Sequence, residues 1–154
     1  MPKNTLAVPA DKARLLERLA TLRANSPRQW GRMTAHQAVC HLSDSFLGVT
    51  GRKSVVDRSN VITRSLLKAV ALNGPGKWPH GIRTMPEMDQ EIGGTKPTEF
   101  ERDRTDLLRL IEGFAQPDQD FCSYRHPAFG AMRPDQWFRW AWLHVDHHLR
   151  QFGV

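Results

Sequence analysis

Residues 134–153 read PDQWFRWAWLHVDHHLRQFG, and this stretch decides the fold class of the 154-residue chain. Proline is favoured in the first turn of a helix, so we expect a helix that begins at Pro134 and runs to about Phe152. At roughly 100° per residue, one arc of this helix collects its aromatic residues and two of its histidines. That arc holds Trp137, Trp140, Ala141, His144, His148 and Gln151. The chain therefore ends in a long helix whose inward face is both apolar and histidine-bearing.

The two histidines on this inward face have the spacing of a metal-binding pair. His144 and His148 are four residues apart, so their rings project from one side of a helix, one turn apart. Burying two imidazoles without partners is costly, and a shared cation removes that cost. The alternative is a pair of ordinary core histidines. Val145 stands where a zinc protease helix has its catalytic Glu, and Asp146 is expected on the opposite, solvated side, so a metalloprotease is disfavoured.

A third histidine, His41, lies on a second expected helix. Thr34 and Gln37 form a capping box that opens this helix, and Gly51 marks its end. His41 lies on a flank of small, polar residues that leave room for an ion and a substrate, whereas His36 lies nearer the outside. The alternative for His41 is a surface or interface histidine. The apolar stripe of this helix is Val39, Leu42, Phe46 and Val49.

Three further helices are expected, and each has a candidate N-cap. Asp11 can cap the first, Ser59 or Asn60 can cap a short third helix, and Thr98 opens another capping box. Alternation with a period of two is nearly absent, so an all-α fold is expected. The apolar residues of these helices are Leu15, Leu16, Leu19 and Leu22; then Val61, Ile62, Leu66, Leu67 and Val70; then Leu107, Leu108, Leu110, Ile111 and Phe114.

One long connection separates the third and fourth helices. Residues 73–97 contain nine Gly or Pro among 25 positions, beginning with the helix-stopping run at 73–76. No helix or long strand fits such a composition. Several large apolar side chains give the segment something to bury. We expect an ordered crossover that lies over the domain, with Trp78 at least partly buried.

Length and composition indicate a single domain, residues 1–154, with a real core. Apolar residues make up 40% and charged residues 25% of the chain, which is typical of globular proteins and excludes a disordered chain. The longest apolar runs are a few residues, so we expect no membrane span and no signal peptide. We expect a cytoplasmic protein, and a homodimer is compatible with the sequence.

The net charge and the cysteine count exclude few classes of function. The net charge is +6, but the basic residues are scattered and match no nucleic-acid motif, so nucleic-acid binding is not expected. Two cysteines, Cys40 and Cys122, do not form a disulfide framework and fit a reducing compartment. Cys40 precedes His41, but adjacent helical residues point roughly 100° apart, so Cys40 is expected to be a small buried residue and not a ligand.

Several motifs together resemble a known superfamily. They are WGRMT at 30–34, CHLSDS at 40–45, HPAFG at 126–130 and HVDHHLRQFG at 144–153, with a tryptophan at position 137. This combination resembles the DinB-like (DinB/YfiT-like) superfamily of metalloenzymes, and within it a subgroup of unknown function. The resemblance runs from about residue 30 to the end. One departure is Arg133, where a capping Ser or Thr would be expected.

The resemblance implies a fold and a cofactor. The fold is a four-helix bundle, here with a long crossover connection and one extra short helix. The cofactor is one divalent metal ion, zinc or nickel, held by three histidines that correspond by position to His41, His144 and His148. Members with known chemistry use low-molecular-weight thiols in transfer or isomerisation reactions.

These observations lead to two hypotheses about function. In the first, the protein is a metal-dependent transferase or hydrolase that acts on a small molecule, with a thiol as possible cosubstrate, because three neutral ligands leave an open coordination position. In the second, it is a non-catalytic module that binds a metal or small ligand. No catalytic base can be assigned. Residues expected around the metal or in the cleft are Ser45, His126, His147 and Gln151.

Overall fold

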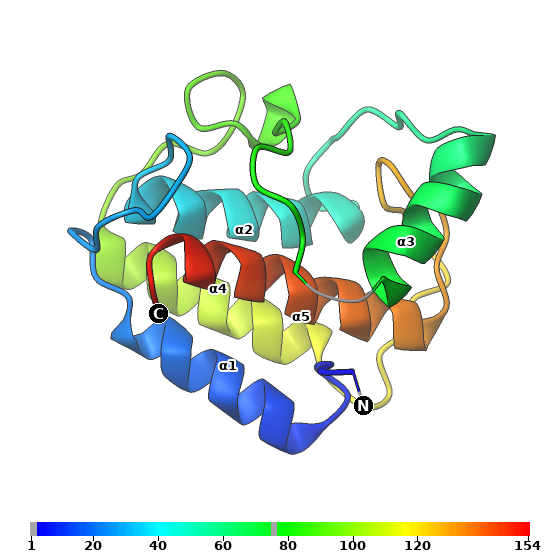
Figure 1. The fold of residues 1–154 in the computed structure, drawn as a ribbon, viewed down its shortest axis with the longest axis horizontal. Helices are drawn as coiled ribbons and strands as arrows, with labels where there is room; N and C mark the ends of the chain where they lie inside the picture. Colours follow the sequence, from blue (N-terminus) through cyan, green and yellow to red (C-terminus); the bar gives the residue numbers. More distant parts are fainter. Residues whose placement is uncertain (1–2, 75–76) are drawn as a thin grey trace.

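The computed structural model describes residues 3–74 and 77–154, and within them every regular element is a helix. The all-α expectation is confirmed. The stop signal at Pro75 and Gly76 lies outside the described residues. The helices, in chain order, are α1 (Pro9–Thr21), α2 (Ala35–Val49), a π-helical turn η1 (Thr63–Leu67) that continues into α3 (Lys68–Asn73), a short 3-10 helix η2 (Pro86–Met88), α4 (Phe100–Phe114) and α5 (Pro134–Gln151) (Figure 1).

The two helices that carry the predicted ligands begin where their sequences indicate. At the start of α2, the Thr34 hydroxyl accepts from the Gln37 amide, and the Gln37 side chain accepts from the Thr34 amide. Pro134 occupies the first turn of α5. The Gln136 side chain accepts from the Arg133 amide, so half of a capping box forms there although position 133 has no hydroxyl.

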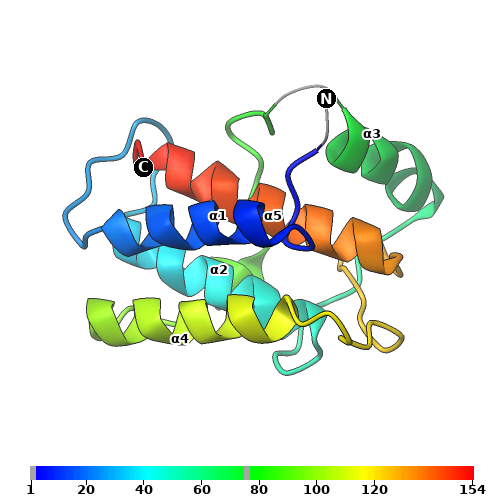
Figure 2. The ribbon, with the colours of Figure 1, turned by 90° about the horizontal axis from the view of Figure 1, so that it is seen from below.

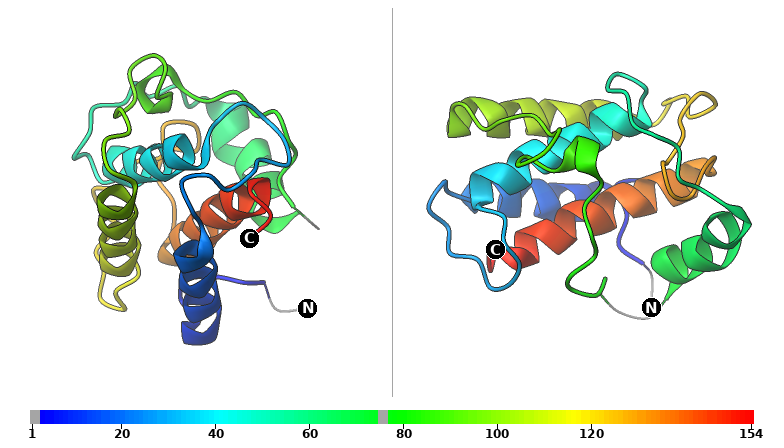
Figure 3. Two further views of the ribbon diagram at one scale, coloured as in Figure 1. Left: turned by 90° about the vertical axis from the view of Figure 1, so that its left-hand side faces the viewer. Right: turned by 90° about the horizontal axis from the view of Figure 1, so that it is seen from above.

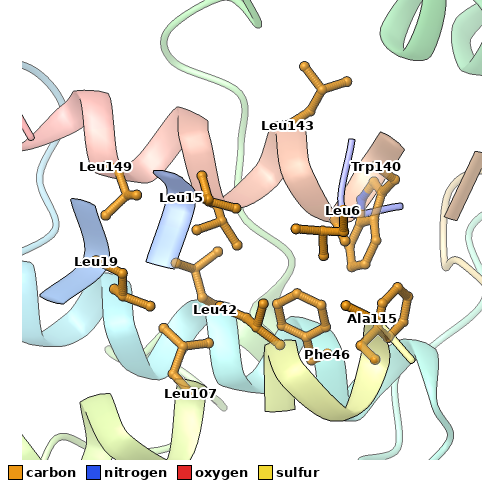
Figure 4. Close-up of a cluster of buried hydrophobic side chains, with 14 of the residues drawn as sticks. Leu6, Leu15, Leu19, Leu42, Phe46, Leu107, Ala115, Trp140, Leu143 and Leu149 are labelled. Carbon is orange, nitrogen blue, oxygen red and sulfur yellow. The ribbon is translucent and has the colours of Figure 1, made fainter. Parts of the chain in front are cut away.

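Four long helices surround the core. α2 packs against α4, α1 packs against α5, and α2 meets α5 (Figures 2 and 3). Leucines and aromatic residues from all four helices interdigitate between them, as Figure 4 shows for Leu15, Leu42, Leu107 and Leu149. The apolar stripes that the sequence assigns to α1, α2, α4 and α5 therefore face one another, and they bring the histidine-bearing stretches of α2 and α5 together.

Two predicted caps are wrong. Asp11 does not cap α1, which begins two residues earlier at Pro9; its carboxylate accepts from the Thr5 amide and pairs with Arg14. The N-cap of α4 is Glu99, one residue after Thr98. In α1, a proline in the first turn takes the place of the expected cap. In α4, the Glu99 carboxylate takes the place of Thr98, because it accepts from the Glu101 and Arg102 amides.

The third helix forms, but its surroundings differ from those of the others. Asn60 caps it, since its side chain accepts from the Thr63 amide. Residues 61–73 are helical throughout, with the π turn in the middle, and this segment stands beside the other helices at one end of the molecule (Figure 1). Leu72 is its buried residue. The five apolar side chains that the sequence assigns to its face are exposed.

The described part of the crossover after the third helix, residues 77–97, lies over α2 and α5. Trp78 is partly buried, as expected from the sequence, and its indole N–H donates to the Ala71 carbonyl. A single turn of 3-10 helix, η2, interrupts the segment, which had been expected to contain no helix. Its C-terminal part is attached to α2 through fully buried Asp44, which accepts from the Gln90 side chain and from the Thr95 amide and hydroxyl.

Replacing Asp44 should loosen this attachment. Asp44→Ala removes the acceptor for Gln90, for Thr95 and for the ammonium of Lys53, 2.8 Å away. We expect a loss of about 3 kcal/mol of unfolding free energy, measured by chemical denaturation. Asp44→Asn keeps one acceptor oxygen and should lose less. A loss below about 1 kcal/mol in the alanine variant would contradict an anchoring role.

Among the described residues no helix has both the length and the apolar character needed to cross a membrane.

Candidate metal centre

Three histidines from two helices meet beneath the crossover. α2 supplies His41, and α5 supplies His144 and His148 from successive turns. The Nε2 atoms of His41 and His144 are 3.1 Å apart, and the His41 and His148 ring centroids are 4.8 Å apart. One ligand nitrogen from each of the three rings lies within 4.8 Å of the others. The expectation that His41 lies beside the α5 pair is confirmed.

Hydrogen bonds fix which nitrogen of two rings carries the proton. His41 Nδ1 lies 3.0 Å from the Met88 carbonyl, which can only accept, so Nδ1 donates and Nε2 keeps its lone pair. His148 Nδ1 donates in the same way to Gln151 Oε1, at 2.9 Å. Gln151 is oriented because its Nε2 donates to the Trp30 carbonyl, at 3.1 Å. Two Nε2 lone pairs are therefore available to one cation, held by the outer contacts that metal-binding histidines generally have.

All three imidazoles are neutral at pH 7. Burial lowers the pKa of His41, and it lowers the pKa values of His144 and His148 well below the ordinary histidine value. For His144 and His148, neighbouring histidines lower the pKa further, because a second positive charge would be repelled. Neutral imidazole is the form that binds metals, so the cluster is electrostatically ready for a cation.

The donor set fits one divalent ion. Three neutral nitrogens converge, and His144 Nδ1 is buried without a hydrogen-bond partner among the residues described. Two facing Nε2 atoms at 3.1 Å are easily satisfied by a cation between the rings. His144 is partly exposed, whereas His41 and His148 are buried.

Of the residues expected around the metal, Gln151 contacts a ligand ring and Ser45 does not. The Ser45 hydroxyl donates to the His41 carbonyl, at 2.8 Å, and lies 3.5 Å from the sulfur of Met88. Ser45 therefore supports the α2 backbone and the crossover. This position for Ser45 follows from the helix geometry, because a serine hydroxyl easily reaches the carbonyl four residues earlier.

His126 is partly buried, and its hydrogen bonds exclude it as a base. The amides of Ala128 and Phe129 both donate to its Nδ1, at 3.1 Å, so the proton sits on Nε2. Its ring stacks on Phe129 and meets Trp140 edge-on. Burial lowers its pKa to about 3, so it stays neutral as an N–H donor.

His147 belongs to an aromatic wall over the centre. Its ring lies near Trp30 and Trp78, with centroids 5.9 and 6.2 Å away. His80 of the crossover stacks on Trp30 at 3.8 Å. Burial lowers the pKa of His147 to about 4. These aromatic rings cover the histidines on the crossover side, where the ring centroids of Trp78 and His144 are 5.8 Å apart.

Asp146 is buried, contrary to the solvated position expected from the helical wheel. Its carboxylate accepts from Arg18 of α1, at 2.7 Å, and from Arg150, at 2.8 Å. The wheel correctly turned Asp146 away from the histidine face. It could not show that α1 packs there and supplies a cationic partner.

A second group of possible ligands, His36, Cys40 and Asp103, has a different character. His36 Nε2 lies 2.7 Å from the Asp103 carboxylate, which also accepts from the Thr98 amide. Burial, followed by the nearby Asp103 charge, raises the pKa of the Cys40 thiol to about 12. The protonated Cys40 thiol and the Asp103 carboxylate therefore form a contact between α2 and α4. The burial expected for Cys40 is confirmed.

Sequence reasoning missed three supporting residues, Met88, Trp30 and Gly31. Met88 and Trp30 act through their backbone carbonyls, which leave no trace in side-chain patterns. Gly31 has a positive φ of 74°, and a Cβ there would lie 2.7 Å from Gln151 Nε2. A glycine next to a tryptophan in the 30–34 motif was the available signal.

Gly31→Ala should weaken the centre without touching a ligand. The new methyl group would push Gln151 from the His148 ring, and the backbone conformation disfavours alanine. We expect about a tenfold weaker affinity for a divalent ion, measured by titration against a chelating indicator dye. Gly113→Ala is the matched control, because a Cβ there meets nothing within 4 Å. Equal affinities in the two variants would contradict a supporting role for Gln151.

A family model described as "Protein of unknown function (DUF1569)" matches residues 3–153. No curated protein and no solved structure matches the chain.

Proposed function

The chain belongs to DUF1569, a family of proteins of unknown function, and we propose from its own side chains that it is a metal-dependent enzyme acting on a small molecule. The observation that carries the proposal is the convergence of three neutral histidines, two of them with Nε2 lone pairs set by outer hydrogen bonds. His41, His144 and His148 would hold one divalent ion, with zinc or nickel suited to nitrogen ligands.

We further propose that the protein is a DinB-like metalloenzyme with a four-helix bundle. The pairing of α2 with α4 and of α1 with α5, and the long crossover before α4, support this assignment. The motifs at 40–45 and 144–153 supply all three ligands. Thiol-dependent group transfer is then the favoured reaction, and hydrolysis is the alternative reaction at the same site.

A divalent ion bound by three neutral ligands would supply Lewis acidity, which lowers the pKa of a thiol or of water at an open position. The protein contributes orientation and exclusion of water. Met88 and Gln151 hold two ligand rings in one orientation, and the aromatic wall around Trp78 shields the centre from the crossover side. His126 presents a fixed Nε2–H donor and stays neutral, so it can bind a substrate acceptor but cannot remove a proton.

The number of ligands favours an enzyme over a purely structural metal site. Structural zinc sites have four protein ligands, whereas this cluster, within the described residues, offers three and is partly exposed at His144. A binding module without turnover would share this geometry, so only an activity measurement separates the two.

The test is a reaction screen on the purified, metal-analysed protein. Low-molecular-weight thiols would be combined with electrophiles, and esters would be tested for hydrolysis. We expect turnover that disappears on chelation and returns with zinc or nickel. No turnover across the screen in a metal-loaded protein would favour the binding module, and turnover unaffected by chelation would contradict the proposed site.

A further inference from the structure

Arg32 lies just before α2 and joins the segment that leads into this helix to the crossover. Its guanidinium donates to the carboxylate of Asp89 and, at 2.8 Å, to the carboxylate of Glu91. The Arg32 side chain is 63% exposed, whereas that of Asp89 is only 7% exposed. A planar guanidinium holds its acceptors in fixed directions, so this contact sets the orientation of the two segments as well as balancing charge.

Asp89 organises the turn that presents the Met88 carbonyl to His41. The Asp89 carboxylate also accepts from the Glu91 amide, at 3.0 Å, and its backbone carbonyl accepts from two amides further along the turn. Met88 directly precedes Asp89, and its carbonyl accepts from the His41 ring. Arg32 therefore holds the residue next to the group that orients the first proposed ligand.

The segment that contains Arg32 also supports the second ligand helix. The carbonyl of Trp30, two residues earlier, accepts from the Gln151 side chain, which in turn accepts from the His148 ring. The Gln29 amide donates to the Gln151 carbonyl, at 2.7 Å. Residues 29–32 are thus bound to α5 on one side and to the crossover on the other.

A continuous series of contacts through the protein therefore connects the His41 ring with the His148 ring. It passes, in order, through Met88, Asp89, Arg32, Trp30 and Gln151. Each ring is oriented by one acceptor, and Arg32 joins the two segments that supply these acceptors. The stacking of His80 on Trp30 is a second contact between the same two segments.

We propose that Arg32 is a positioning residue that couples the orientations of His41 and His148, although it hydrogen-bonds to neither ring. Its consequence for metal binding rests on the proposed function: rings already held in their relative orientation lose less freedom when an ion binds, so the ion binds more tightly. An ordinary surface ion pair contributes little to stability and would affect neither ring in particular.

The first test is made on metal-free protein labelled with ¹⁵N at histidine. The Nδ1–H groups of His41 and His148 donate to carbonyl oxygens, so their NMR signals should exchange slowly with water in the wild type. In Arg32→Gln, both signals should exchange faster, by about threefold or more, because both acceptors become less firmly held. The matched control is Arg14→Gln, since Arg14 is 65% exposed and pairs with Asp11, whose side chain is 10% exposed. This control should leave both signals unchanged.

The second test is zinc affinity, measured by competition with a chelating indicator dye. Arg32→Gln should weaken it by about three- to tenfold, at or below the lower end of the effect of losing an outer contact, because the stacking of His80 on Trp30 remains. Arg32→Lys should fall between this variant and the wild type, since an ammonium keeps the charge but not the fork that binds both carboxylates. Arg14→Gln should bind zinc like the wild type.

The outcomes separate this inference from the proposed metal centre. Unchanged exchange in Arg32→Gln would overturn the positioning role, and so would faster exchange at His41 alone, because the coupling would then stop at the crossover. Equal zinc affinities in Arg32→Gln and Arg14→Gln would also overturn it. A wild-type protein that binds no divalent ion would contradict the metal centre, whereas the exchange comparison, made without metal, would still decide the role of Arg32.

Discussion

His41→Ala protein is expected to purify without stoichiometric metal, as are His144→Ala and His148→Ala. Each variant leaves two of three nitrogen ligands, and among the described residues the cluster includes no carboxylate or thiolate to compensate. Loss of an outer contact typically weakens metal affinity by about 10–100-fold, so loss of a ligand should exceed that range. Elemental analysis of the purified proteins, followed by zinc titration, measures the effect.

The informative comparison is between His41 and His148. The two residues come from different helices, so equal losses in His41→Ala and His148→Ala would indicate one shared centre. His36→Ala is the control, because His36 lies in the separate group with Cys40 and Asp103. If His41→Ala kept one metal per chain, the proposed ligand set would be wrong. Circular dichroism establishes that each variant is folded.

The metal-free protein is expected to lose stability steeply as the pH falls below about 6.5. Burial lowers the pKa of His126 from 6.5 to about 3, so below pH 6.5 the unfolded chain binds a proton that the folded chain does not. This difference lowers the unfolding free energy by about 1.4 kcal/mol per pH unit for one group, or about 2 kcal/mol at about pH 5. His41, His144 and His148, whose pKa values are also lowered, act in the same direction.

Chemical denaturation in chelator at about pH 7.5 and pH 5 tests this prediction. His126→Phe keeps a ring against Phe129 and Trp140 but cannot titrate. It should lose stability at both pH values, because two amides lose their acceptor, yet its difference between the two pH values should be about 2 kcal/mol smaller than that of wild type. An unchanged difference would show that His126 does not remain neutral in the folded protein.

Local signals predicted α2 and α5 well, because these helices begin at residues with strong capping chemistry. The hydrogen bonds between Thr34 and Gln37 form within the first turn of α2, and Pro134 stands in the first turn of α5. Both signals depend little on the rest of the fold. The proximity of His144 and His148 follows from helix periodicity alone. Placing His41 beside them required a tertiary contact, which the small, polar flank of α2 indicated only together with the resemblance of the motifs at 40–45 and 144–153 to a known superfamily.

Other features depend on contacts between segments that are distant in sequence, and local side-chain patterns do not predict such contacts. Asp146 was expected in solvent, but it pairs with Arg18, 128 positions away in sequence. The apolar residues of the third helix indicated its formation correctly, yet periodicity cannot tell whether a face meets the same chain or is left exposed. The groups that orient His41 and His148 include backbone carbonyls, which every residue has.

The crossover and the histidine centre share one hydrogen bond, from His41 to the Met88 carbonyl, and this contact makes them thermodynamically linked. An ion that requires the oriented ring binds more tightly when residues 86–95 are in place, and it must stabilise that segment by the same factor. Amides such as Thr95, which donates to Asp44, should then exchange with solvent deuterium more slowly after metal is added. Local opening of the crossover would also set the pace at which a bound ion escapes.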